Sequence, residues 1–223
     1  MLRQAIRKIP GVPQLIKLNT DFEDWWFDWR HGTDTSADRA DQARKGWETD
    51  TTNHTYVPIR PKCARRVLQA LPVTNPQEYT FIDVGCGKGR MLLMALEAYS
   101  FRTAIGIELR KELSDLAKLN LHNDDRARLC SATCMNVNAM DFQFPEEKLV
   151  LYLFNPFGEE VMRTFLENLD RSLESSFRDV WVIMDFPVYA SIADSMPYLS
   201  FVTEGYDYRI YRSKDPQAMA VAA

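Results

Sequence analysis

The feature that most constrains the fold is an alternation of short apolar runs with helical patterns, which begins near residue 60. Short apolar runs bounded by turn residues are typical of buried strands, and apolar residues three or four apart indicate amphipathic helices. The predicted strands are residues 79–84, 103–107, 130–137, 149–154, 180–184, 201–204 and 208–211. The predicted helices are residues 64–71, 89–99, 111–122, 159–173 and 190–196.

The order of these elements predicts an α/β fold with a mostly parallel sheet and helices on both faces. Strands that alternate with helices form parallel sheets, and apolar strands of this kind are buried on both sides. The last two strands are joined by a short turn at Gly205. Because a hairpin pairs its strands in opposite directions, we expect an antiparallel C-terminal edge strand.

Composition divides the chain into three parts. Residues 56–215 carry the α/β pattern, and residues 216–223 have no cap or turn signal and are expected to fray. Residues 1–55 are expected to form a helical or irregular cap, in which the aromatic run DFEDWWFDWR occupies 21–30. That run can bury its rings against the domain, form one wall of a substrate pocket, or do both. The polar stretch at 31–59 is typical of a loop or lid.

Net charge and hydropathy limit where the protein is expected to reside and which partners it is expected to bind. The 223-residue chain has a net charge of −4, which disfavours nucleic acid as the main partner. No apolar run approaches the ~18 residues of a membrane span, and no signal-peptide pattern is visible, so we expect a cytoplasmic protein. The chain nevertheless starts with basic residues and has no acid before Asp21; the basic residues are Arg3, Arg7, Lys8 and Lys17. This start suits a flexible arm, a mitochondrial presequence or a membrane-surface helix.

The cysteines are expected to be free thiols rather than metal ligands. Cys130 and Cys134 have a C-x3-C spacing, but no further pair of Cys or His residues completes a zinc site. The other two are Cys63 and Cys86. We therefore expect no metal site.

The most informative segment is FIDVGCGKGR at residues 81–90, where the first predicted strand meets a helix. Ligands of open α/β sheets bind at the carboxyl ends of the strands. Gly85, Gly87 and Gly89 permit positive φ angles and let a ligand approach the backbone. Asp83 can orient the loop or accept a hydrogen bond from a ligand ammonium.

The spacing of the glycines distinguishes a dinucleotide site from a site for an adenosine cofactor without phosphate. The dinucleotide fingerprint is G-x-G-x-x-G before a helix that faces a pyrophosphate, whereas this chain has D-x-G-x-G-x-G. S-adenosylmethionine (SAM) has no phosphate, so its site needs one acid near the loop for the ammonium and a second for the ribose. Glu108, at the end of the second predicted strand, can accept hydrogen bonds from both ribose hydroxyls.

These segments carry a family resemblance. The run DVGCGKG resembles motif I of the class I SAM-dependent methyltransferases, and GIEL at 106–109 is similar to the acidic end of their second strand. The resemblance covers about residues 56–185 and implies a Rossmann-like, seven-stranded sheet with a late reversed strand. It implies that the amino acid end of SAM is lined by Asp83, Gly85, Cys86, Gly87, Lys88 and Gly89.

The same resemblance assigns the rest of the cofactor. It implies that Glu108 holds the ribose and that Leu109 packs on the adenine. The family often has an Asp-Ala pair after the third strand, whose acid contacts the adenine amine. This chain has Asn138 and Ala139 there, so an Asn amide would make that contact, or Asn138 is only a loop residue.

The fourth long strand ends in LFNPFG at residues 153–158, which resembles the Asn-Pro-Pro-aromatic motif of amino-group methyltransferases. In that motif two carbonyl oxygens accept hydrogen bonds from the target nitrogen, and an aromatic ring stacks beside it. The resemblance gives these roles to Asn155, Pro156 and Phe157. The second proline of the motif is missing, so the target atom is left open, and the alternative is a turn that only shapes the pocket floor.

Two upstream segments point to narrower groups. The segment YVP at 56–58 is similar to the Tyr-x-Pro segment of the seven-stranded lysine methyltransferases related to the telomeric-silencing histone enzyme, where it closes over SAM. Residues 27–35, FDWRHGTDT, resemble the N-terminal signature of small uncharacterised bacterial methyltransferases that share the Asn-Pro-Phe-Gly turn. The resemblance therefore adds Tyr56 to Asn155 and Phe157 as the residues expected around the methyl acceptor.

The resemblance implies a SAM-dependent methyltransferase that methylates a nitrogen of a protein side chain or a small amine by in-line displacement. A general base is needed only if the nucleophile must lose a proton. Candidates on the expected lid are His31, His54 and Asp34, each of which could instead be a surface or capping residue. Two other hypotheses stay open: a SAM- or nucleoside-binding domain or regulatory subunit without catalysis, and a nicotinamide oxidoreductase.

Overall fold

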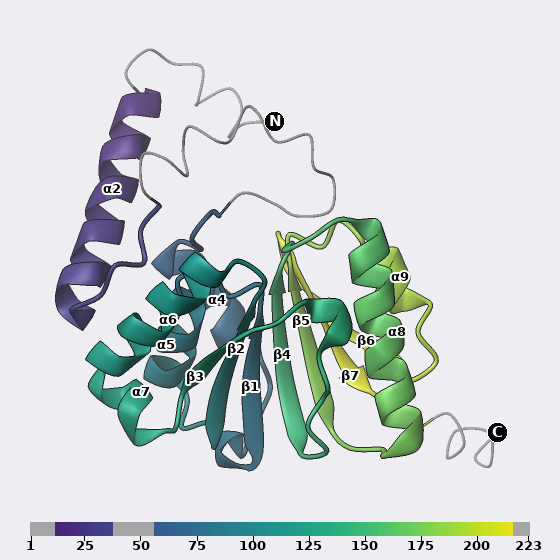
Figure 1. Ribbon diagram of the computed structural model, residues 1–223. Coiled ribbons are helices and arrows are strands. Elements are labelled where there is room, and N and C mark those ends of the chain that lie inside the picture. Colours follow the sequence, from purple (N-terminus) through teal and green to yellow (C-terminus); the bar gives the residue numbers. More distant parts are fainter. Residues whose placement is uncertain (1–11, 38–55, 216–223) are drawn as a thin grey trace.

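A seven-stranded sheet forms the centre of the molecule (Figure 1). The structure is a computed structural model that describes residues 12–37 and 56–215. The strands are Tyr79–Val84 (β1), Thr103–Glu108 (β2), Thr133–Asn136 (β3), Lys148–Phe154 (β4), Val180–Asp185 (β5), Leu199–Glu204 (β6) and Tyr208–Ser213 (β7). Their order in the sheet is β3-β2-β1-β4-β5-β7-β6.

The directions of the strands confirm the predicted fold class. Strands β1 to β5 pair in parallel, and β7 pairs antiparallel with both β5 and the edge strand β6. The chain runs outward from β1 to β3 and then returns to β4 on the other side of β1. The strand order therefore reverses between β1 and β4, which is where α/β sheets of this kind bind ligands.

Helices cover both faces of the sheet (Figure 1). One face carries α4 (Pro61–Gln69), α5 (Arg90–Ala98), α6 (Lys111–Asn123) and α7 (Asp125–Leu129). The other face carries α8 (Glu159–Ser175) and α9 (Ala190–Asp194). Two short 3-10 helices, η1 (Pro76–Glu78) and η2 (Ala139–Asp141), precede β1 and β4.

The alternation of side chains along β1 builds two cores. Phe81 joins the cluster under α4 and α5, whereas its neighbour Ile82 joins the cluster under α8. All six residues of β1 are buried. Because successive residues of a strand point to opposite faces, a strand buried on both sides is mostly apolar, which is why β1 could be predicted exactly. Its two polar residues are Thr80 and Asp83.

The third strand is shorter than predicted. It spans Thr133–Asn136 rather than residues 130–137, because the unpredicted helix α7 and its turn occupy the preceding residues. The Asp124 carboxylate caps α7 by accepting hydrogen bonds from the backbone N–H groups of Arg126 and Ala127. An Asp at this position is among the strongest helix-start signals.

The N-terminal cap contains one long helix, α2 (Val12–His31), which stands beside α4 (Figure 1). Pro13 lies in its first turn, where proline removes no intrahelical hydrogen bond. Its aromatic residues are arranged unlike the prediction: Phe27 is buried, but Trp25, Trp26 and Trp29 are 46–63% exposed. These tryptophans do not line the main cavity described below, and Trp26 borders a small groove between α2 and α4.

Candidate cofactor and acceptor site

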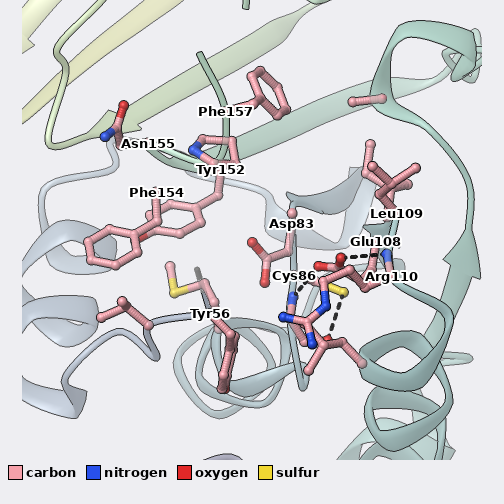
Figure 2. Close-up of a pocket in the computed structure, with 18 of the residues that line it drawn as sticks. Tyr56, Asp83, Cys86, Glu108, Leu109, Arg110, Tyr152, Phe154, Asn155 and Phe157 are labelled. Atoms are coloured by element: carbon pink, nitrogen blue, oxygen red, sulfur yellow. Dashed lines mark hydrogen bonds between the residues drawn. The ribbon is translucent and has the colours of Figure 1, made fainter. Parts of the chain in front are cut away.

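A cavity of about 820 Å³ opens at the carboxyl ends of β1, β2, β4 and β5 (Figure 2). This volume is within the range of small-molecule sites. Asp83, Glu108 and Asn155 line it from β1, β2 and the end of β4, together with Tyr56 from the segment before α4. The strand order reverses at the same place, so the topology and the side chains indicate the same site.

The glycine loop forms the floor of the cavity. Gly85 and Gly87 have φ angles of +74° and +54°, which side chains rarely adopt. A Cβ atom on Gly85 would lie 2.6 Å from Cβ of Pro156, and one on Gly87 would lie 2.1 Å from Cε2 of Tyr56. Both positions therefore require glycine for conformation and for space.

Asp83 places a buried carboxylate at the end of β1. Its side chain lines the cavity and the residue is 3% exposed. Burial raises the pKa of Asp83 well above its usual range, and the neighbouring Cys134 and Glu108 add to this effect. A cationic ligand group in the cavity would reverse the effect, because an opposite charge within hydrogen-bond distance favours the ionised form.

Glu108 ties the second strand to the glycine loop. One carboxylate oxygen accepts a hydrogen bond from the Gly87 N–H at 2.9 Å, and the other accepts one from the Arg110 N–H at 2.8 Å. Burial raises the pKa of Glu108, and these two hydrogen bonds partly offset the increase. Each oxygen has a second lone pair, so the oriented carboxylate can still accept hydrogen bonds from a diol.

The residues predicted for the adenine lie at the end of the cavity beyond Glu108. Leu109, Asn138 and Ala139 all line it. The Asn138 side-chain oxygen already accepts a hydrogen bond from the Met140 N–H at 3.0 Å. Its amide NH₂ is therefore the group that Asn138 can direct at a ligand, as a donor rather than as the acceptor that an Asp would be.

Cys86 lines the cavity beside Asp83, as the resemblance implied. Its sulfur lies 3.4 Å from that of Cys134, and both residues are buried free thiols. The contact with Cys134 and burial together raise the pKa of Cys86 well above its usual range. The thiol is therefore neutral and packs as a small apolar group against the loop.

Two predicted cofactor residues do not line the cavity. Lys88 is 2% exposed, and its ammonium is directed at the N-terminal segment, 2.8 Å from the Ser36 carbonyl oxygen and 3.3 Å from the Asp34 carboxylate. Gly89 is the residue before α5, and a Cβ there would contact Ala117 of α6. These two residues of motif I therefore contact other parts of the protein, on the side of the loop away from the cavity.

Tyr56 covers the glycine loop with its ring and not with its hydroxyl. The hydroxyl donates a 2.6 Å hydrogen bond to the Thr35 carbonyl oxygen, and burial raises the pKa of Tyr56 above its usual range. Its ring lies against Gly87, where an added Cβ would overlap Cε2 and Cδ2 of the ring. Tyr56 therefore lines the cavity, and because its hydroxyl is paired with Thr35, only its ring is available to a ligand there.

The candidate bases of the lid are also placed elsewhere. His31 is buried and pairs with Asp124 through a 2.8 Å contact between Nδ1 and Oδ2. Asp34 is two-thirds exposed and faces Lys88. His54 lies outside the described residues. Neither His31 nor Asp34 lines the cavity, so neither is positioned to take a proton from an acceptor there.

Arg90 holds the N-terminal segment against the domain, a role that the sequence reasoning missed. It is 2% exposed and donates hydrogen bonds to the carboxylate of Asp24, the Thr35 hydroxyl and the Ile59 carbonyl oxygen. Asp28 accepts four hydrogen bonds from the backbone and hydroxyl groups of Thr35 and Ser36. Arg90 directly follows the glycine loop, which was the only sequence signal for it.

The turn after β4 forms the other half of the cavity. Asn155 has a φ angle of +42°, and its side-chain oxygen is buried without a hydrogen-bond partner among the described residues. Pro156 packs on Gly85. Phe157 lines the cavity, but its ring also packs 6.0 Å from Phe165 of α8, so it belongs partly to the core.

Two aromatic rings that were not predicted form a wall beside Asn155. Phe154 and Phe186 meet edge to face at 5.6 Å between ring centroids, and both line the cavity. Phe186 has a φ angle of +51°. A large side chain in this conformation costs about 1–2 kcal/mol, and such strain is concentrated at functional sites.

The comparisons with known proteins agree with this geometry. The family described as "Histone methylation protein DOT1" matches residues 43–153. A tRNA (guanine-N(7)-)-methyltransferase of Drosophila virilis is 31% identical over 31% of this chain and 30% of its own length. A protein-lysine N-methyltransferase of Saccharolobus islandicus (strain REY15A) is 32% identical over 31% of this chain and 42% of its own length.

A solved structure extends the comparison to most of the fold. It is the precorrin-6y C5,15-methyltransferase of Geobacter metallireducens GS-15, with a TM-score of 0.51 and 12% sequence identity over 75% of this chain and 96% of that chain. The fold is that of a class I methyltransferase. The matches support the predicted SAM-dependent methyltransferase, although the chain spans less than half the length of the curated relatives named above.

Beside the cavity, this methyltransferase fold carries one further buried acid. The Tyr152 hydroxyl donates a 2.8 Å hydrogen bond to one carboxylate oxygen of Asp185, at the end of β5. The other oxygen of Asp185 has no partner among the described residues. Burial raises the pKa of Asp185 to about 6, the nearby Asp207 adds to the increase, and the Tyr152 hydrogen bond opposes it.

Proposed function

We propose that this protein is a SAM-dependent methyltransferase that acts on a nitrogen of a protein side chain or a small amine. The observation that carries the proposal is the layout of one cavity. Two carboxylates, those of Asp83 and Glu108, lie on either side of a glycine loop at the ends of neighbouring strands, and the buried oxygen of Asn155 belongs to the same cavity.

The cofactor half of the cavity fits SAM group by group. Asp83 offers a negative charge to the ammonium, which would compensate the burial of that carboxylate. Glu108 has its two oxygens fixed by backbone N–H groups and can accept from the ribose hydroxyls. Leu109 and Asn138 supply an apolar contact and an amide for the adenine. Gly85 has no side chain, so the cofactor can approach the backbone there.

The acceptor half supplies orientation rather than acid–base catalysis. SAM, when bound, would supply an electrophilic methyl group. The lone pair of the acceptor nitrogen would attack the methyl carbon in line with the carbon–sulfur bond, and neutral S-adenosylhomocysteine would leave with that bond's electron pair. The Asn155 oxygen can accept a hydrogen bond from an N–H of the acceptor and so direct the lone pair. Phe154 and Phe186 present aromatic surface, which attracts cationic groups and excludes water. Holding two reactants in this way accounts for a large part of such rate enhancements.

The cofactor assignment is tested by calorimetric titration with S-adenosylhomocysteine, with NAD as the control ligand. The unsubstituted protein should bind the first in the micromolar range and not the second. Asp83→Ala and Glu108→Ala should abolish that binding, whereas Asp115→Ala, which removes a half-exposed carboxylate on α6, should not. Binding of NAD in place of S-adenosylhomocysteine, or unchanged affinity in the Asp83 and Glu108 variants, would contradict the assignment.

The acceptor assignment needs a separate variant and a separate readout. Asn155→Gly removes the carboxamide and tolerates the positive φ angle of this residue. It should lower kcat/KM by about tenfold or more, the value of one hydrogen bond made in the transition state, and leave the affinity for S-adenosylhomocysteine unchanged. The substrates are proteins, small amines and tRNA, offered separately with labelled SAM.

Three results of that assay would contradict the acceptor assignment. Methylation of tRNA alone would replace the acceptor class and leave the cofactor assignment standing. Cofactor binding without turnover on any of the three would favour a non-catalytic domain or regulatory subunit. Equal turnover by Asn155→Gly and the unsubstituted protein would remove Asn155 from the acceptor site.

A further inference from the structure

The outward face of α2 is an uninterrupted apolar stripe. At 100° per residue, six residues fall within an arc of about 100°, and no polar residue of the helix lies inside that arc. All six are exposed by 46–66% and are Leu15, Leu18, Phe22, Trp25, Trp26 and Trp29. The stripe extends for about 21 Å, from the helical rise over fourteen residues.

The inward face of the same helix is already satisfied by the domain. Phe27 is 3% exposed and lies under the Arg90 guanidinium. Asp24 and Asp28 face Arg90, and His31 pairs with Asp124. The helix is therefore anchored by Phe27 and by its polar residues, and it directs the six residues of the stripe outward. Surface helices of soluble proteins turn their apolar face toward the core. An apolar stripe that faces outward is therefore expected to bind another surface.

The composition of the stripe is that of a membrane interface. Three of its six residues are tryptophans that contact one another: the rings of Trp25 and Trp29 stack at 6.2 Å, and those of Trp26 and Trp29 lie 5.0 Å apart. Tryptophan is enriched where an apolar layer meets water and charged groups. A large apolar patch on a surface marks such an interaction site.

Cationic side chains border the stripe on the α4 side. A groove of about 110 Å³ runs between α2 and α4. Its lining includes Phe22 and Trp26 of the stripe, the cations Arg30, Lys62 and Arg65, and one acid, Glu23. Arg30 and Lys62 are about half exposed. Their acidic neighbours are more buried: Glu97 is 22% exposed and Glu23 is 26% exposed. The border thus presents positive charge outward, and an anionic surface complements it.

We propose that this face of α2 docks on the surface of an anionic phospholipid bilayer. The helix would lie in the plane of the interface, with its Trp, Phe and Leu side chains among the acyl chain ends and the cations of the rim at the lipid phosphates. In the sequence, Arg3, Arg7 and Lys8 precede the helix without an acid, which adds to this attraction. Within residues 12–37 and 56–215, no helix is long and apolar enough to cross a bilayer.

The test is flotation of the full chain with phosphatidylcholine vesicles, with and without phosphatidylglycerol. We expect salt-sensitive binding to the anionic vesicles only. Trp25→Ala/Trp29→Ala keeps a strong helix former in α2 and should reduce the bound fraction about tenfold or more. The matched control is Leu129→Ala on α7, an apolar side chain that is 88% exposed, and it should bind like the unsubstituted protein.

Cofactor affinity separates this proposal from the proposed function. All three proteins should bind S-adenosylhomocysteine equally, which also shows that they are folded. Lys62→Glu/Arg65→Glu should abolish the preference for anionic vesicles. The proposal is overturned by absent flotation, by equal binding to both vesicle types, or by full binding of the tryptophan variant. Dimerisation that the tryptophan variant abolishes, without vesicle binding, would assign the stripe to a second copy of the chain instead.

Discussion

Substituting Gly87 should reveal how closely Tyr56 covers the cofactor loop. In Gly87→Ala the new Cβ would lie 2.1 Å from Cε2 and 2.5 Å from Cδ2 of the Tyr56 ring. The residue would also have to keep a φ angle of +54°. The left-handed conformation costs about 1–2 kcal/mol, and overpacking in a filled site costs about 1–3 kcal/mol. We therefore expect Gly87→Ala to lower the free energy of unfolding by about 2–5 kcal/mol.

A double-mutant cycle separates these two costs. Urea unfolding would be measured for Gly87→Ala, Tyr56→Ala, the double variant and the unsubstituted protein. In the Tyr56→Ala background the clash is gone, so adding Ala at position 87 should cost only the about 1–2 kcal/mol of the φ angle. An equal cost of Gly87→Ala in both backgrounds would refute the reasoning, because it would mean that the ring does not rest on the glycine.

Two buried acids should give opposite pH dependences of stability. Burial raises the pKa of Asp185 to about 6. The protonated carboxyl therefore contributes its full stabilisation below about pH 4. As the pH rises through about 6, the free energy of unfolding falls by about 3 kcal/mol. Asp185→Asn should flatten that part of a urea stability–pH profile and be the more stable protein at pH 7; an unchanged profile would contradict this. Burial also raises the pKa of Asp124, but hydrogen bonds from His31 and the backbone N–H groups outweigh it, and the pKa is lowered. Its stabilisation is therefore present above about pH 4 and is lost as the pH falls through its folded-state pKa. Asp124→Asn should lose stability at neutral pH and show a weaker acid dependence, and retention of the full acid slope would argue against the pair.

The sheet could be predicted because its strands are buried on both sides. In β1 and β4 the requirement for burial on both faces leaves a short run of mostly apolar residues, and these strands were predicted within one residue. The short strand β3 has only Cys134 buried, so its sequence carries little apolar signal and its ends were misplaced. Helix α2 shows the opposite problem. Its apolar residues recur at a helical spacing in the sequence, but that spacing does not show which face of the helix packs against the domain.

The site was predictable where ligand chemistry fixes the residue type. Asp83, Glu108, Gly85 and Gly87 line the cavity at the positions that the motif predicted, whereas Gly89 does not. Backbone geometry and charge demand these residue types there. The partners of Lys88 and Tyr56 were not predictable, because both interact with residues 34–36, distant in sequence. Phe186 was missed for a similar reason: only the pairing of β5 with β4 brings it beside Phe154.

Arg90 connects two parts of the molecule that have separate tasks. It directly follows the glycine loop at the start of α5, and its guanidinium holds the Asp24 carboxylate of α2. Any surface that binds α2 and any ligand that orders the glycine loop therefore act on one shared network. Thermodynamic linkage then requires reciprocity: the factor by which docking of α2 changes the affinity for the cofactor equals the factor by which the cofactor changes the affinity of α2 for its surface.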